Sequence, residues 1–202
     1  MPWYCFGIFA VTELVLLQNR LILEGKTMYQ MQQNRIKLSP GIINGLRSGK
    51  EQENFSAINK LRASGKPEYI PHIVDLLCHT RHSTIKAEIY KLLSELKQNE
   101  SVPYLIEAIL DDKNIHVRRG LIEICWQNGL KYAQYLPVFI GLVISEDDQV
   151  AFEAFTVIEN MEYIPEKEIV AEQIEKAYQH LGKVSETKQY FLNEIIKFLQ
   201  NW

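Results

Sequence analysis

Two arginines, Arg118 and Arg119, stand side by side in the stretch DDKNIHVRRGLIEIC, and guanidinium groups can bind phosphate or carboxylate. Adjacent residues on a helix point about 100° apart, so the two side chains are poorly placed to share one task. We expect Arg118 to pair with an acid or a helix C-terminal carbonyl inside the fold. Arg119 is then free for a surface contact. Binding of phosphate by the pair is the alternative.

The stretch CHTRH contains three potential zinc ligands, Cys78, His79 and His82. A structural zinc site needs four ligands in recognisable paired spacing, and no second cluster follows in the sequence. Cys78 also continues an apolar helical stripe, where a cysteine behaves as a small hydrophobic residue. We therefore predict a turn with solvated histidines and no bound metal.

Catalytic motifs are missing from the sequence, which contains no GxSxG, P-loop, GxGxxG or HExxH pattern. Carboxylates do occur in groups, at residues 111–112, at residues 146–148 and at Glu166 and Glu168. Each group stands at a predicted helix start, where acidic side chains cap free N–H groups and complement the helix dipole. The sequence therefore predicts a protein that is not an enzyme, with no catalytic residues and no cofactor.

Composition is that of one ordinary globular domain: 202 residues, 47% apolar and 23% charged. The formal charge of −3 argues against a nucleic-acid partner, because domains that bind nucleic acid are usually strongly basic. Charge is unevenly distributed, with eight Lys/Arg and four Asp/Glu in residues 1–65 but fourteen and twenty-one in residues 66–202. Three cysteines are too few and too scattered for a disulfide framework, which favours a cytoplasmic location.

Residues 1–27 are rich in apolar side chains but contain Glu13 and Arg20, and the longest uncharged run is shorter than a membrane span. Three interpretations stay open. The translation start is placed too early, since Met28 and Met31 precede an ordinary polar stretch; or the segment is an amphipathic helix that caps the fold; or it associates with a membrane. In each case residues 1–39 lie outside the rest of the pattern, which we expect to form one domain over residues 40–202.

Five prolines mark a repeat along that domain. They are Pro40, Pro71, Pro103, Pro137 and Pro165, with spacings of 31, 32, 34 and 28 residues. Proline suits the first turn of a helix, where its missing N–H group costs nothing. Apolar residues at helical spacing follow each proline, so each is predicted to begin a helix of about three turns.

A second helix is predicted after each of these, at residues 53–65, 83–96, 114–129, 147–161 and 187–201. One set of apolar positions, Ile58, Ile89, Leu121 and Ala154, recurs with spacings of 31, 32 and 33 residues, and the set Leu61, Leu92, Ile124 and Val157 recurs with the same spacings. A helical hairpin of this size cannot bury its apolar stripe alone, so neighbouring hairpins must stack. The sequence predicts an all-α stack of about five hairpins.

The stretch that contains Arg118 resembles the second-helix signature of HEAT repeats. That signature has an acid in the inter-helix turn, then a β-branched residue and a basic residue, which Asp112, Val117 and Arg118 match. Ile85-Lys86 keeps the pattern, whereas residues 147–151 have alanine at the basic position. The resemblance covers about residues 40–201. It implies a right-handed α-solenoid whose second helices line a concave face.

Aromatic residues are frequent on the predicted second helices: Tyr90, Trp126, Phe152, Phe155, Tyr190, Phe198 and Trp202. We expect most of them to be core, with Tyr90 and Phe152 projecting outward because their neighbours already supply the buried stripe. Exposed aromatic and arginine side chains are typical interface anchors. The candidate partner-binding patch on the concave face consists of Lys86, Tyr90, Arg119, Glu123 and Phe152.

The leading functional hypothesis is a non-catalytic protein–protein interaction module or scaffold, binding a protein or peptide on that face. The family resemblance also admits an enzyme, since HEAT-like folds include alkylpurine DNA glycosylases and lyases of bilin chromophores. The acidic charge over most of the repeats disfavours the glycosylase, and no residue matches a chromophore site. A third hypothesis is a membrane-tethered scaffold, which depends entirely on residues 1–27.

Overall fold

The computed structural model describes residues 38–163 and 165–201. A boundary between Ser39 and Pro40 separates the N-terminal segment from a second unit, Pro40–Trp202. All three interpretations of residues 1–27 concern a segment outside the described residues. Within the described part of the chain, no helix is both long and apolar enough to cross a membrane.

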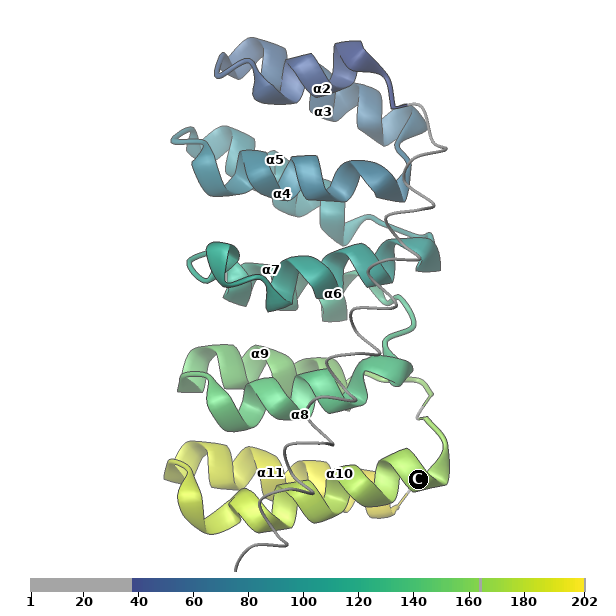
Figure 1. Ribbon diagram of the computed structural model, residues 1–202, viewed down its shortest axis with the longest axis vertical. Coiled ribbons are helices and arrows are strands. Elements are labelled where there is room, and N and C mark those ends of the chain that lie inside the picture. Colours follow the sequence, from purple (N-terminus) through teal and green to yellow (C-terminus); the bar gives the residue numbers. More distant parts are fainter. Residues whose placement is uncertain (1–37, 164, 202) are drawn as a thin grey trace, which may run out of the picture. The chain divides into compact units, whose positions relative to one another are not determined.

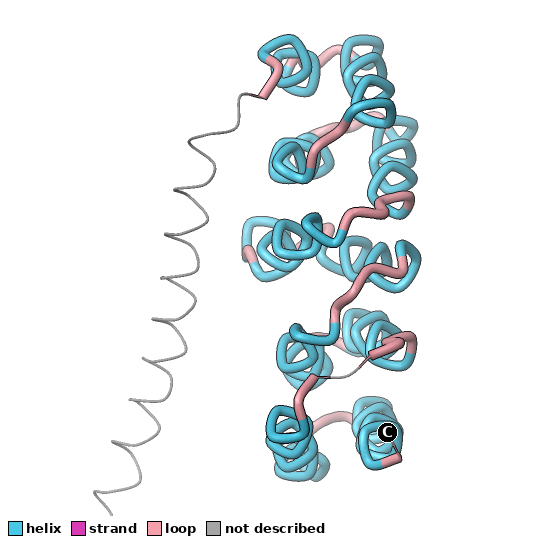
Figure 2. Tube along the Cα trace, turned by 90° about the vertical axis from the view of Figure 1, so that its right-hand side faces the viewer, coloured by secondary structure: helices cyan, strands magenta, loops and turns pink. Residues whose placement is uncertain are grey.

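The described residues form ten α-helices and no strand, arranged as five consecutive hairpins (Figure 1). A view turned by 90° separates the helices into two layers (Figure 2). The first layer consists of α2 (Pro40–Arg47), α4 (Ile70–His79), α6 (Val102–Leu110), α8 (Leu136–Ser145) and α10 (Lys167–His180). The second consists of α3 (Glu51–Ser64), α5 (Ser83–Ser94), α7 (Arg118–Asn128), α9 (Asp148–Glu159) and α11 (Glu186–Gln200). We call the outer surface of the second layer the second-helix face. The predicted all-α stack is confirmed.

Prolines begin the first-layer helices as predicted in four of five hairpins. Pro40 is the first residue of α2, and Pro71, Pro103 and Pro137 each lie in the first turn of their helix. The fifth prediction is wrong, because α10 begins only at Lys167. The residue between, Glu166, has φ −57° and ψ 150°, and this extended backbone delays the helix by two residues.

Helix α7 is shorter than predicted, because it begins at Arg118 rather than at Asn114. Residues Asp112–Asn114 form a 3₁₀ turn first, and the Asp111 carboxylate caps it by accepting a hydrogen bond from the Lys113 backbone N–H at 3.0 Å. The helix ends at Gly129, whose left-handed backbone (φ 64°) is the conformation that glycine adopts at least cost.

The predicted register of the buried stripe is confirmed. Ile58, Ile89, Leu121 and Ala154 are each 0% exposed. The second set, which lies one turn further along each helix, is also buried: Leu61, Leu92, Ile124 and Val157. Because residues three or four apart share one side of a helix, this stripe is the side that each second helix turns toward the neighbouring helices. The opposite side becomes the second-helix face.

Polar side chains near the starts of three second-layer helices bind the ends of first-layer helices. Asn54 donates to two carbonyls at the end of α2, at 2.8 and 3.0 Å. Arg118 donates to a carbonyl at the end of α6 at 2.9 Å. Lys188 donates to two carbonyls at and just beyond the end of α8, both at 2.8 Å. The last carbonyls of a helix lack intrahelical partners, so these bonds both satisfy them and join the layers.

Candidate functional site

Arg118 belongs to the structure of the stack, as predicted. Its guanidinium donates to Glu146 Oε1 at 2.6 Å, to Asp112 Oδ1 at 3.0 Å and to the Ile109 carbonyl at 2.9 Å. The side chain is 5% exposed. Its partners include both an acid and a helix C-terminal carbonyl, which are the two groups expected from the sequence. Arg118 is therefore not available to bind a ligand.

Arg119 is not free, and this corrects the expectation. Its Nε lies 3.2 Å from Glu153 Oε1, and its Nη1 donates to Gln149 Oε1 at 3.3 Å. Glu153 is buried, and its other oxygen accepts a hydrogen bond from Trp126 Nε1 at 3.1 Å. Arg119 thus neutralises a buried carboxylate of the next repeat, while about half of its own side chain stays exposed.

Lys86 occupies a different place from the rest of the candidate patch. Ile89 and Leu121 correspond, 32 residues apart, so Lys86 corresponds to Arg118 and not to Arg119. Its charge acts on Cys78: burial and nearby carboxylates raise the pKa of that thiol, and Lys86 opposes the rise. Lys86 therefore faces the junction with the first layer.

Tyr90 lies across the next helix rather than projecting outward. A Cβ atom added to Gly120 would meet Tyr90 Cε1 and Oη at 2.6 Å, so the ring occupies the space that this glycine leaves. Burial, with a contribution from the Glu123 carboxylate, raises the pKa of the Tyr90 hydroxyl. The structure thus brings Tyr90 of α5 together with Gly120 and Glu123 of α7, with the tyrosine half-buried.

The aromatic residues gather between α9 and α11. Phe155 stacks on Phe191 with centroids 4.9 Å apart, and Phe152 and Tyr190 contact the same ring at 6.0 and 6.1 Å. Phe155 and Phe191 are buried, whereas Phe152 is 50% and Tyr190 59% exposed. We call these four residues the aromatic cluster. It presents two rings to solvent that are supported by two buried ones.

The expectation that most second-helix aromatics are core is wrong. Of those in the described range, only Phe155 is buried, while Phe152 and Tyr190 are exposed and the others are half-buried. The physical reason is that aliphatic residues already fill the buried stripe, so the aromatic residues occupy the flanking positions. Phe152 is exposed as predicted, but the contribution of Phe191 was missed. Its position, one residue after Tyr190, carries no distinguishing signal in the sequence.

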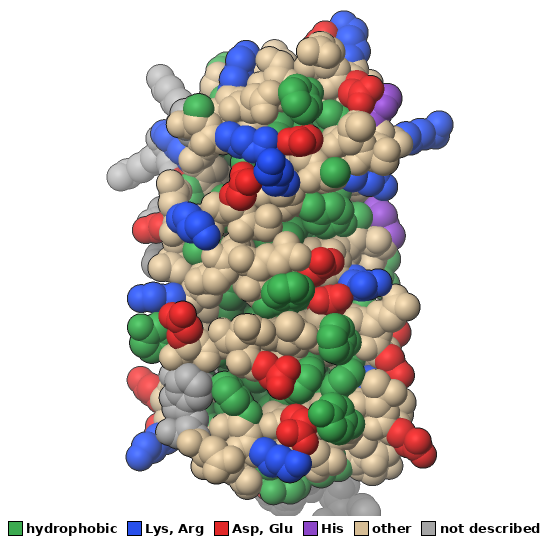
Figure 3. Space-filling model, turned by 180° about the vertical axis from the view of Figure 1, so that it is seen from behind, with side chains coloured by type: hydrophobic (Ala, Val, Ile, Leu, Met, Phe, Trp, Pro, Cys, Tyr) green, Lys and Arg blue, Asp and Glu red, His purple; other side chains and the backbone are tan. Residues whose placement is uncertain are grey.

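Carboxylates surround the aromatic cluster. Burial and the nearby Glu194 carboxylate raise the pKa of Glu159, so these two acids of α9 and α11 disfavour each other's charge. Glu194 accepts from Lys197 at 2.7 Å, and Glu123 accepts from Gln127 at 2.9 Å. Figure 3 shows the second-helix face, where hydrophobic side chains are interspersed with acidic ones toward the α9–α11 end.

Comparison with known families now fits this geometry. A family model described as HEAT repeats matches residues 39–125, which span α2 to most of α7. Residues 39–125 belong to the HEAT-repeat family. Among curated proteins, none matches the chain.

HEAT repeats typically form protein-interaction scaffolds and are usually non-catalytic. The hairpins after residue 125 continue the same helix pairing and the same buried register. The aromatic cluster therefore lies on the part of the stack that follows the matched HEAT repeats.

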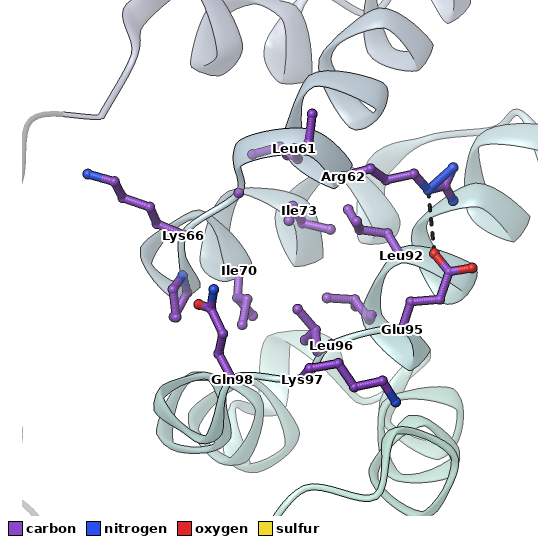
Figure 4. Close-up of a pocket in the computed structure, with 14 residues that line it drawn as sticks. Leu61, Arg62, Lys66, Ile70, Ile73, Leu92, Glu95, Leu96, Lys97 and Gln98 are labelled. Carbon is purple, nitrogen blue, oxygen red and sulfur yellow. Dashed lines mark ion pairs between the residues drawn. The ribbon is translucent and has the colours of Figure 1, made fainter.

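A cavity of about 600 Å³ opens between the first two HEAT-repeat hairpins, near the ends of α3 and α5 (Figure 4). Its floor is made of isoleucine and leucine side chains that belong to the core. Arg62 on its rim is paired with Glu95 at 3.6 Å, and Figure 4 shows Lys66 and Lys97 directed away from the cavity. Because the charged groups pair with each other or point outward, the cavity is a weaker candidate than the second-helix face.

The residues of the CHTRH stretch do not converge in this HEAT-repeat stack. Cys78 Sγ donates to Asn114 Oδ1 at 3.2 Å, His79 Nδ1 lies 2.7 Å from the Asp75 carbonyl, and His82 faces Glu51 at 3.5 Å. Over residues 38–163 and 165–201, no group of three or more His, Cys, Asp or Glu side chains could hold a metal ion.

Proposed function

We propose that the HEAT-repeat stack is a non-catalytic interaction scaffold that binds a partner protein or peptide on its second-helix face. The binding surface extends from Tyr90, Arg119 and Glu123 to the exposed rings of Phe152 and Tyr190. Lys86, which the sequence places on the same surface, is left out because it aligns with Arg118. The observation that carries the proposal is the half exposure of Phe152 and Tyr190 above a packed aromatic core.

Rigid exposed aromatic residues suit protein recognition for an energetic reason. An aromatic side chain buries a large apolar area, and one that is already held by its neighbours loses little conformational entropy on binding. Phe152 and Tyr190 are held in this way by their contacts with Phe191. A few such residues often carry most of the binding free energy of an interface.

The cysteines of the described residues support a non-catalytic role. Burial raises the pKa of Cys125 to about 12 and also raises the pKa of Cys78. The thiolate is the nucleophilic form of cysteine, so both thiols are poor nucleophiles at neutral pH.

The test compares what the full chain captures from cell extract after cross-linking with what two variants capture. Phe152→Ala/Tyr190→Ala removes the exposed rings of the cluster. Tyr178→Ala removes a tyrosine of similar exposure, 49%, from α10 of the first layer. We expect the double variant to lose a partner that the wild type and the Tyr178 variant retain, with circular dichroism confirming that all three are folded. Equal capture by all three, or selective loss by the Tyr178 variant, would contradict the proposal.

A further inference from the structure

The charge near the aromatic cluster indicates which kind of partner fits the face. Residues 146–202 contain twelve Asp/Glu, five Lys and no Arg. This segment includes α9, α10 and α11, and so both helices that carry the aromatic cluster. A surface of one sign attracts partners of the opposite sign and speeds their association.

Helix geometry puts the acids on the same side as the exposed rings. Glu159 follows Phe152 by seven residues on α9, and Glu194 follows Tyr190 by four residues on α11. Residues four or seven apart share one side of a helix, and seven residues span about 10 Å along its axis. Each exposed ring thus has a carboxylate on the same side of its own helix, and the two carboxylates face each other across the α9–α11 pair.

The negative charge there is only partly compensated. Arg119, the nearest arginine on α7, is already bound to the buried Glu153. Glu194 is paired with Lys197, but that pair is exposed, and exposed pairs contribute little. Among the described residues, no salt bridge involves Glu159, and the neighbouring Glu194 helps to raise its pKa. An incoming cation would relieve this repulsion.

We propose that the α9–α11 part of the second-helix face binds a basic protein segment. Arginine or lysine side chains of the segment lie over the rings of Phe152 and Tyr190 and pair with Glu159 and Glu194. This inference rests on the proposed scaffold function and names the chemistry of its partner.

Two kinds of contact make a cation the fitting ligand. An aromatic ring attracts a cation through the negative charge of its face, and a carboxylate forms strong charge-assisted hydrogen bonds with guanidinium or ammonium groups. An apolar partner would instead bury the two carboxylates without partners, which is costly. Nucleic acid and anionic membranes would be repelled by the same charges.

The test measures binding of a fluorescent peptide of repeating Arg-Gly-Ser to the full chain by fluorescence anisotropy. The same peptide with citrulline in place of arginine keeps the shape and removes the charge. Glu159→Gln/Glu194→Gln removes two charges from the face, and it should not destabilise the fold because these carboxylates repel each other. The matched control Glu172→Gln/Glu175→Gln removes two exposed charges from α10 of the first layer.

We expect the arginine peptide to bind the wild type and the citrulline peptide not to bind. Glu159→Gln/Glu194→Gln should weaken binding about tenfold or more, and Phe152→Ala/Tyr190→Ala should do the same, because each contact contributes roughly 1 kcal/mol or more. The control should stay within about twofold of wild type. Equal weakening by the control would mean general charge attraction and would overturn the inference, as would binding of the citrulline peptide.

The captured partner separates failure of this inference from failure of the scaffold proposal. If capture depends on Phe152 and Tyr190 but is unchanged by Glu159→Gln/Glu194→Gln, the scaffold stands and the basic-segment inference is wrong. If capture survives both double variants, the scaffold proposal itself is wrong.

Discussion

At the scale of single residues, Arg118 and Arg119 show how one step along the chain changes the role of a side chain. Arg118 points into the junction of α6 and α7 and is 5% exposed, whereas Arg119 reaches over α9 and is half-exposed. The difference follows from the rotation of about 100° between successive residues of a helix. Both arginines are engaged, but with partners of different burial and on different elements.

We predict that Arg118→Ala lowers the free energy of unfolding by about 3 kcal/mol. The substitution leaves the Glu146 carboxylate and the Ile109 carbonyl without their donor, and removing one partner of a buried ion pair is strongly destabilising. Urea unfolding followed by circular dichroism measures the loss. A change under about 1 kcal/mol would show that solvent replaces these contacts.

For Arg119→Ala we predict a smaller loss, about 1 to 2 kcal/mol, because the substitution leaves the buried Glu153 with Trp126 as its remaining donor. The control is Arg62→Ala, which breaks partly exposed pairs with Glu88 and Glu95 and should cost less than about 1 kcal/mol. Equal losses for the two variants would mean that the burial of Glu153 does not matter.

Cysteine reactivity is a third prediction at this scale. With its pKa raised to about 12, Cys125 has about one thiolate in ten thousand at pH 8 in the folded protein. We expect iodoacetamide at pH 8 to leave Cys125 unmodified in the native state, while the half-buried Cys78 reacts slowly. In urea both should react at similar rates. Peptide mass spectrometry distinguishes the two sites, and rapid native modification of Cys125 would contradict its burial.

At the scale of elements, the register of the second helices decides which side of each helix is core. Leu121 sits at the centre of α7 and is fully buried, while Ile115, in the turn before α7, is 61% exposed. The two residues have similar hydrophobicity, so their different burial comes from helix geometry and not from residue type. Only the periodicity of the whole repeat distinguishes them in the sequence.

Leu121→Asp should lower the free energy of unfolding by more than about 4 kcal/mol, because it places an unpaired charge in the stripe that joins α5, α7 and α9. Ile115→Asp is the control and should change stability by less than about 0.5 kcal/mol. Thermal unfolding of both variants checks the pair. If the two melt within a degree or two of each other, the register is wrong by at least one position.

At the scale of the whole repeat unit, each hairpin packs on its neighbours in the chain, as Figures 1 and 2 show. The stability of such a stack is approximately a sum of hairpin terms and nearest-neighbour interfaces. The arrangement permits one end to open without the other. It also means that the aromatic cluster depends on α9 and α11 and not on α2 or α3.

Ile195→Ala, which creates a cavity at a fully buried position of α11, should therefore act locally. We predict faster amide hydrogen exchange in α8 to α11 and unchanged exchange in α2 to α5. Ile58→Ala, at a fully buried position of α3, should give the reverse pattern. Exchange measured by mass spectrometry tests this, and a uniform increase along the chain would indicate a single cooperative unit.

The sequence by itself determined the number of hairpins, the buried register and the structural role of Arg118. These features recur with each repeat, so several copies of the same signal reinforce one another, as the burial of Ile58, Ile89, Leu121 and Ala154 confirms. Helix starts were predicted less well where the signal occurs once. Pro165 begins no helix, because a single extended residue after it was enough to shift α10.

Only the tertiary structure decided the surface. The pairing of Arg119 with Glu153, the seating of Tyr90 on Gly120 and the exposure of Tyr190 each depend on how one helix is rotated and displaced against the next. The apolar period specifies which side of a helix is core, but residues at the edges of that side turn in or out with small rotations. The candidate binding surface consists of such edge residues, so sequence periodicity could indicate its helices but not its contacts.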